Sequence, residues 1–216
     1  MTAEHSRRRA SAMSPEQRRE AIVEAVLPLV RQHGAKITTK QIAQAADIAE
    51  GTVFRAFKDK DELLRACVTA ALRPDELCAA VRGIDRDTDA AVRLTRASGL
   101  FLDHFTRFGE LMHTLAASGF DLRGGHAEGK PSPMDEREQF IRDLNAALAS
   151  LFEPGELRIP PERLAELLQA LVLGIRFTST AANTAEVDQD AEIRDRVDVL
   201  LHGAAADNTN TTGEPR

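Results

Sequence analysis

The sequence predicts an all-α protein in which a three-helix N-terminal domain, containing a helix-turn-helix, is joined to a C-terminal helical domain. Apolar residues recur at helical spacing through most of the chain, and there is no alternating strand pattern of useful length. Three short helices, with a tight turn between the second and third, are predicted within residues 14–59. The remaining boundaries are a flexible basic arm at 1–13, a helical domain at 60–203 that starts with a connecting helix at 60–72, and a disordered tail at 204–216.

Composition excludes several classes of protein. The apolar runs in these 216 residues are only a few residues long, whereas a membrane span needs about 20. No apolar segment follows the three arginines at 7–9, so we expect no secretory signal. Cys67 and Cys78 form no CxxC motif and have no metal-ligand spacing. A soluble cytoplasmic protein without metal or cofactor is therefore expected.

Charge is distributed unevenly along the chain. The net charge is −6, yet residues 1–65 hold 12 Lys and Arg against 9 Asp and Glu, a net charge of +3. The other residues hold 16 basic and 25 acidic side chains, a net charge of −9. A basic front on an acidic body is expected where one end of a protein meets a polyanion, although many proteins divide this way by chance.

The first helix is predicted from its capping signals. Ser14 and Gln17 form a capping box, Pro15 suits the first helical position, and Gly34 marks the end. Pro28 lies inside this helix and should kink it, because proline has no backbone N–H. The expected apolar stripe consists of Ile22, Val23, Val26, Leu27, Leu29 and Val30.

The next three helices have similar signals. Thr38 and Gln41 form a second capping box, before a short helix that buries Ile42, Ala43, Ala45 and Ala46. Asp47 stands where a left-handed residue is needed, which aspartate tolerates better than most. A third helix is predicted over Glu50–Ala56, and it is weakly capped because Ala49 has no side-chain acceptor. A further capping box, Asp59 to Glu62, opens the connecting helix.

The third helix has two distinct sides. Ile48, Val53, Phe54 and Phe57 are expected to form an apolar wedge behind it, which leaves Glu50, Gly51, Thr52 and Arg55 to face outward. Gly51 removes side-chain bulk, so backbone could approach a phosphate or a base edge. Thr52 and Arg55 are three residues apart and share a face.

These segments resemble the DNA-binding domain of the TetR (tetracycline repressor) family. The resemblance rests on Thr38-Thr39-Lys40-Gln41-Ile42-Ala43, on Ile48 to Phe57, and on Lys60-Asp61-Glu62-Leu63-Leu64, and it covers residues 18–65. It implies a dimeric regulator whose three-helix DNA reader is followed by a helical domain for ligand binding and dimerisation.

The candidate DNA contacts are Thr38, Thr39, Lys40, Glu50, Gly51, Thr52, Phe54, Arg55 and Lys60. Thr38, Thr39, Lys40 and Lys60 are candidates for phosphate, with capping or plain surface charge as the alternatives. For Arg55 the alternative is a salt bridge to Asp59. Glu50 either accepts from a cytosine amino group or complements its own helix N-terminus. Many relatives have tyrosine where this chain has Phe54, so a phenol contact to phosphate is lost or replaced.

The other predicted helices span residues 74–82, 87–108, 110–118 and 135–152, one helix opens at Pro161, and a final one contains Ile193 and Val197. The candidate ligand pocket is lined by Phe101, His104, Phe105, Phe108, Met112, His113, Phe140, Leu144 and Phe177, with core packing as the alternative for each. The candidate dimer interface consists of Leu164, Leu168, Leu171, Ile175, Ile193, Val197 and Leu200, and the alternative is intramolecular core.

The resemblance therefore implies a dimeric repressor that leaves a palindromic operator when it binds a small, largely apolar effector. An activator of the same family, or an interaction module with a vestigial DNA reader, are the alternatives. No nucleophile elbow, phosphate loop, zinc signature or dinucleotide fingerprint is present, so we do not expect an enzyme.

Overall fold

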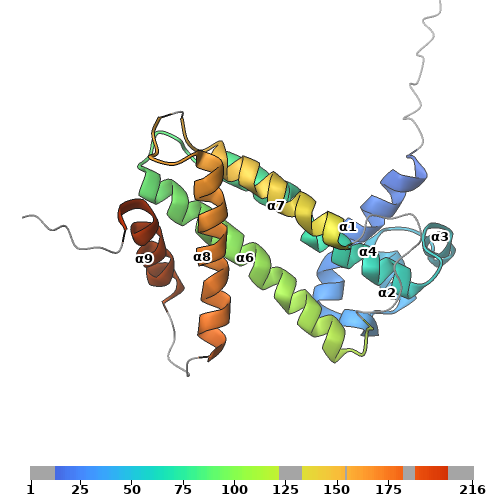
Figure 1. The fold of residues 1–216 in the computed structure, drawn as a ribbon. Coiled ribbons are helices and arrows are strands. Elements are labelled where there is room, and N and C mark those ends of the chain that lie inside the picture. Colours follow the sequence, from blue (N-terminus) through green and yellow to red (C-terminus); the bar gives the residue numbers. More distant parts are fainter. Residues whose placement is uncertain (1–12, 122–132, 154, 182–187, 204–216) are drawn as a thin grey trace, which may run out of the picture. The chain divides into compact units, whose positions relative to one another are not determined.

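The computed structural model describes residues 13–121, 133–153, 155–181 and 188–203, with no side-chain description for 133–136 and 176–181. All regular structure in these ranges is helical (Figure 1), so the predicted all-α class is confirmed. The predicted arm, except Met13, and the predicted tail lie outside the described residues.

The helices follow one another in a simple order. The elements are α1 (Pro15–His33), a 3₁₀ turn η1 (Gly34–Lys36), α2 (Thr39–Ala45), α3 (Glu50–Ala56), α4 (Lys60–Leu72), α5 (Asp75–Arg82), α6 (Ala90–Ala117), α7 (Pro133–Ala149), α8 (Pro161–Ala181) and α9 (Gln189–His202). The break expected near residue 109 is wrong, because α6 continues through Gly109. An isolated glycine costs a helix only about 1 kcal/mol, which tertiary packing can offset.

The chain divides into two compact units. Unit 1 is Met1–Arg73 with Arg107–Glu128, and unit 2 is Pro74–Thr106 with Gly129–Arg216. Unit 1 thus includes α4 and the last part of α6 as well as the three helices predicted to form the DNA-binding domain. The reason is hydrophobic: Leu63, Leu64 and Cys67 of α4 are fully buried in the same core as the stripe of α1.

Local capping signals in unit 1 are confirmed. Ser14 and Thr38 each cap their helix in a complete capping box, and Asp47 has a φ of 51°. Gly34 ends α1 with a φ of 55°, and a Cβ there would lie 2.3 Å from Ser118 Oγ. At Asp59 only half of the expected box forms, because the Glu62 carboxylate accepts instead from the Lys58 amide at 2.7 Å.

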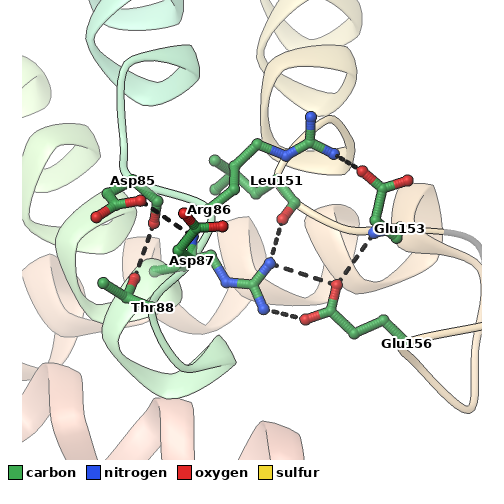
Figure 2. A network of polar contacts seen from close by, with 8 residues as sticks. Asp85, Arg86, Asp87, Thr88, Leu151, Glu153 and Glu156 are labelled. Carbon is green, nitrogen blue, oxygen red and sulfur yellow. Dashed lines mark hydrogen bonds and ion pairs between the residues drawn. The ribbon is translucent and has the colours of Figure 1, made fainter.

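Unit 2 has its own core, in which α5, part of α6, α7, α8 and α9 take part. Buried Arg93 of α6 organises the loop between α7 and α8: its guanidinium donates to the Leu151 carbonyl and to the Glu156 carboxylate. Figure 2 shows this network, in which Glu156 also accepts from the Glu153 amide at 3.0 Å. The Arg93 hydrogen bond holds the pKa of Glu156 below its usual value.

Candidate nucleic-acid interface

The turn between α2 and α3 is closed by backbone hydrogen bonds and by small side chains. The Ile48 amide donates to the Ala43 carbonyl at 3.0 Å, across the left-handed Asp47. Ala43 is buried, and its small side chain lets α3 pack closely on α2. A shallow hollow of about 420 Å³ lies over this turn, lined by Lys40, Ala43, Gln44, Asp47, Ile48, Ala49 and Glu50.

Burial fixes which side of α3 faces out of unit 1. Val53 and Phe57 are 4% and 1% exposed, so they anchor the helix to the core. Phe54 was expected in the same wedge, and that expectation is wrong, because its side chain is 56% exposed. The helix packs on α2 and α1, so only the residues on that side of it enter the core. Phe54 lies one residue beyond that side, about 100° around the helix.

The outward face of α3 consists of Glu50, Gly51, Phe54 and Arg55, all of them exposed, while Thr52 is half-buried. A Cβ at Gly51 would meet no atom within 4 Å, so this part of the face is open. In the described chain no ion pair joins Arg55 to Asp59, and the guanidinium of Arg55 therefore remains available. The first turn of α3 has no side-chain cap, as predicted from Ala49.

The start of α2 carries three of the candidate phosphate ligands. Thr38 is exposed, and its hydroxyl accepts from the Gln41 amide at 3.2 Å and donates to Gln41 Oε1 at 2.9 Å. Thr39 is half-buried and Lys40 is exposed. Capping therefore occupies the Thr38 hydroxyl. Lys40 is exposed, so of these three side chains we expect it to reach a phosphate most easily.

Lys60 has a structural contact that the sequence did not indicate. Its Nζ donates to the Ala35 carbonyl at 2.8 Å, which ties the start of α4 to the segment that leads into α2. The Ala35 amide in turn donates to Ser118 Oγ at 2.7 Å. An ammonium group has three donors, so this bond leaves two for a phosphate oxygen.

Arg19 is a positioning residue that sequence reasoning missed. Its guanidinium donates to the Ala56 carbonyl at the end of α3, pairs with Glu62 at 2.6 Å, and lies 4.3 Å from the centroid of the Phe57 ring. These contacts join α1, α3 and α4. Its partners lie 37 to 43 residues away in sequence, so no local pattern could have indicated the cluster.

Three exposed polar residues near this face were also missed as candidates. Gln44 lies one helical turn after Lys40 on α2, Lys58 follows α3, and Lys36 precedes α2. Two sequence patterns could have indicated them as candidate DNA contacts. Gln44 follows Lys40 at the four-residue spacing of one helix face, and Lys58 and Lys60 form a local pair of cations.

The candidate pocket residues fall into both units. In unit 2, His104 stacks on Phe140 with ring centroids 5.6 Å apart, and Phe105 lies edge-on to Phe101 and Phe140 at 4.9 and 5.5 Å. Leu144 is fully buried in the same core. Three candidates lie in unit 1: Phe108 packs on its core, Met112 is half-buried and His113 is exposed. The side chain of Phe177 is not among those that the structure describes.

Most candidate dimer residues are buried inside their own chain. Leu164, Leu168, Ile175, Ile193 and Val197 are at most 4% exposed in the unit 2 core, and Leu200 packs against it. The apolar stripe was therefore found, but it is mainly the inward side of α8 and α9. Leu171 is half-buried and lies outside that core cluster, as does Leu167, and Val199 is 46% exposed.

In α2 and α3 the second helix is anchored to the core by one side and exposes the other. This is the arrangement of helix-turn-helix DNA-binding proteins, in which the exposed side of the second helix contacts DNA. Residues 22–67 match the family model described as bacterial regulatory proteins, tetR family. The N-terminal part of the chain is therefore similar to the DNA-binding domain of tetR-family regulators. In the described part of the chain, no helix is both long enough and apolar enough to cross a bilayer.

The similarity to known proteins extends beyond this segment. The chain is 29% identical, over 190 residues, to the HTH-type transcriptional regulator BetI of Paraburkholderia phytofirmans, covering 85% of this chain and 93% of that protein. A transcriptional regulator from Rhodococcus sp. RHA1 shares the fold, with a TM-score of 0.56, 20% identity and coverage of 86% and 96%. A tetR-family regulator from Streptomyces coelicolor has a TM-score of 0.55, 20% identity and coverage of 87% and 80%.

Proposed function

We propose that this protein is a dimeric repressor that binds a palindromic operator through α2 and α3 and is released by a small, largely apolar effector. The observation that carries the DNA-binding part is the outward face of α3. Its Arg55 is exposed and available, and Gly51 leaves the backbone accessible. Such a regulator works in the cytoplasm, where the DNA is.

Dimerisation follows from the size of this face. One seven-residue helix offers few base contacts, whereas a two-fold dimer engages two half-sites about 34 Å apart. We propose that the partner packs on Leu167 and Leu171 of α8 and on Val199 of α9. These apolar side chains are half-buried or exposed and lie outside the core of their own unit.

The effector part of the proposal rests on the aromatic cluster of unit 2. Phe101 and Phe140 are buried in the unit 2 core, Phe105 packs on them, and His104 is the polar group beside these three rings. An apolar molecule with one hydrogen-bonding group suits such surroundings. Binding that changes the separation of the two DNA readers would weaken their fit to a fixed half-site spacing.

Selection of bound duplexes from a random DNA pool, at low and at high salt, tests this function. We expect a palindrome with half-sites about one helical turn apart, lost at high salt because phosphate contacts release counterions. A reporter controlled by the recovered palindrome then separates repression from activation. No enrichment at either salt would contradict the proposal and favour an interaction module with a vestigial reader.

A further inference from the structure

Phe54 is the most exposed large hydrophobic residue in the part of the chain that the structure describes. It is 56% exposed, compared with 50% for Met13 and 46% for Val199. Leaving an aromatic ring in water forgoes the free energy that its burial would contribute. Its neighbours Val53 and Phe57 are buried, so α3 is anchored without it.

The ring lies among groups suited to the major groove. Gly51 is one helical turn before Phe54 and adds no side chain beside it, and Arg55 is the next residue along the same exposed face. A phenyl ring has no hydrogen-bonding atom. It can therefore pair neither with a phosphate oxygen nor with the polar edges of the bases.

The major groove presents one apolar group at its floor, the C5-methyl of thymine. We propose that Phe54 is a specificity residue that packs on the C5-methyl of a pyrimidine in each half-site, which would be thymine or 5-methylcytosine. This inference rests on the proposed function, because it requires that α3 enters the groove.

The methyl group can be removed without changing base pairing, by replacing thymine with uracil. The probe is the palindromic duplex recovered by the pool selection, with each thymine of a half-site replaced in turn by deoxyuridine, symmetrically in both half-sites. At one thymine position we expect the wild type to lose about fourfold in affinity for each half-site, or about fifteenfold for both.

The variant Phe54→Ala should bind the thymine and uracil duplexes equally, because it has no ring to pack on the methyl. Ile141→Ala is the matched control: it also removes an exposed apolar side chain, but from α7. This control should keep the full methyl dependence. Thermal melting of both variants verifies that they are folded.

A second probe uses cytosine at the sensitive position. Exchanging the T·A pair for C·G should weaken binding, and 5-methylcytosine at the same place should recover about fourfold per half-site in the wild type. Phe54→Ala should show no such recovery. This comparison separates the methyl group from the other differences between the two base pairs.

Three results would overturn the inference while leaving the proposed function intact. One is a recovered operator whose affinity is unchanged by uracil at every position. Another is a uracil effect that persists in Phe54→Ala, which would assign the methyl to another residue. The third is a loss of affinity in Phe54→Ala that is the same for thymine and uracil duplexes, as expected if the ring packs on deoxyribose. Failure to recover any operator would instead overturn both proposals.

Discussion

Arg55 and Lys60 are both exposed cations of unit 1, yet their surroundings suit them to different contacts with DNA. Arg55 stands on the outward face of α3, where a guanidinium can form two hydrogen bonds to one guanine. Lys60 stands at the start of α4 and already donates to the Ala35 carbonyl. We therefore expect Arg55 to contribute to sequence preference and Lys60 to contribute mainly to affinity.

Arg55→Ala should weaken operator binding by about tenfold and relax preference at one position of each half-site. Lys60→Ala should weaken binding to all sequences similarly and reduce the salt slope by about one for each half-site. Titrations of the operator and of single-base variants, at several salt concentrations, measure both effects. Equal affinity of the wild type and both variants would contradict these roles.

Cys67 provides a pH-dependent test of the core of unit 1. Burial raises the pKa of its thiol from 9.0 to about 12, because a thiolate there would lose its hydration. The raised pKa favours the folded state fully below pH 9, and the contribution is lost as pH rises from 9 towards 12. We expect the free energy of unfolding to fall over that range by up to about 1.4 kcal/mol for each pH unit.

Urea unfolding at several alkaline pH values measures this slope, and Cys67→Ala is the comparison. The variant starts less stable, because it leaves a small cavity, but its stability should fall less steeply with pH. A thiol reagent should modify Cys67 only when the protein unfolds. Identical slopes for the variant and the wild type would show that the thiol does not titrate as described.

At the scale of the element, α3 lacks a side-chain cap. Ala49 has extended backbone angles, φ −71° and ψ 146°, which are those of a normal N-cap residue. Ala49→Ser should therefore stabilise the protein by about 0.5–1 kcal/mol, since the hydroxyl can accept from an amide of the first turn. Urea unfolding measures the change.

Ala116→Ser is the control for this substitution. It makes the same chemical change at an exposed position in the last turn of α6, away from any helix N-terminus, and it should be neutral or slightly destabilising. A stabilisation of both variants by the same amount would show that capping is not the cause.

Features set by neighbouring residues were predictable from sequence, and features set by distant ones were not. The capping boxes at Ser14 and Thr38 and the left-handed Asp47 depend on groups three to five residues away, and all three were predicted. The exposure of Phe54 depends on where α1 and α2 pack against α3. The contacts of Arg19 depend on residues about 40 positions away, so periodicity could not indicate either feature.

The same distinction applies to α8 and α9. Periodicity located their apolar stripes, but an apolar residue gives the same signal whether it faces its own core or a partner. The structure buries Leu164, Leu168 and Ile193 inside the chain and leaves Leu171 half-buried. Which side of a helix is covered follows from the helices packed against it, which the sequence of one helix does not contain.

At the scale of the whole molecule, the proposed dimer depends on the outward residues of α8 and α9. Leu171→Glu should give monomers, because a carboxylate at an apolar interface must be desolvated without a partner. Light scattering after size exclusion measures the mass. The monomer should also bind the palindrome at least tenfold more weakly, since it engages one half-site.

Ile141→Glu is the matched control, because it also places a carboxylate at a partly exposed apolar position, on α7. This variant should remain dimeric and bind normally. A Leu171→Glu protein that is still a dimer would move the interface to another surface, and a wild type that is monomeric would remove the basis for a palindrome.

Overall charge makes DNA binding a demanding requirement for this protein. The chain carries a net charge of −6, so its average field repels DNA. Binding therefore requires that unit 1 present its exposed cations locally, among them Lys40, Arg55, Lys58 and Lys60. Local phosphate contacts of this kind are strongly sensitive to salt, whereas apolar contacts with another protein are not.

The most direct test of DNA binding is the affinity of the full chain for a duplex of random sequence, followed as salt rises from about 50 to 200 mM. The structure predicts saturable binding at low salt and a logarithm of affinity that falls linearly with the logarithm of salt, with a slope of about −0.9 for each phosphate contacted. No saturable binding at the lowest salt, or an affinity unchanged across the range, would contradict the assignment of α2 and α3 as a DNA-binding surface.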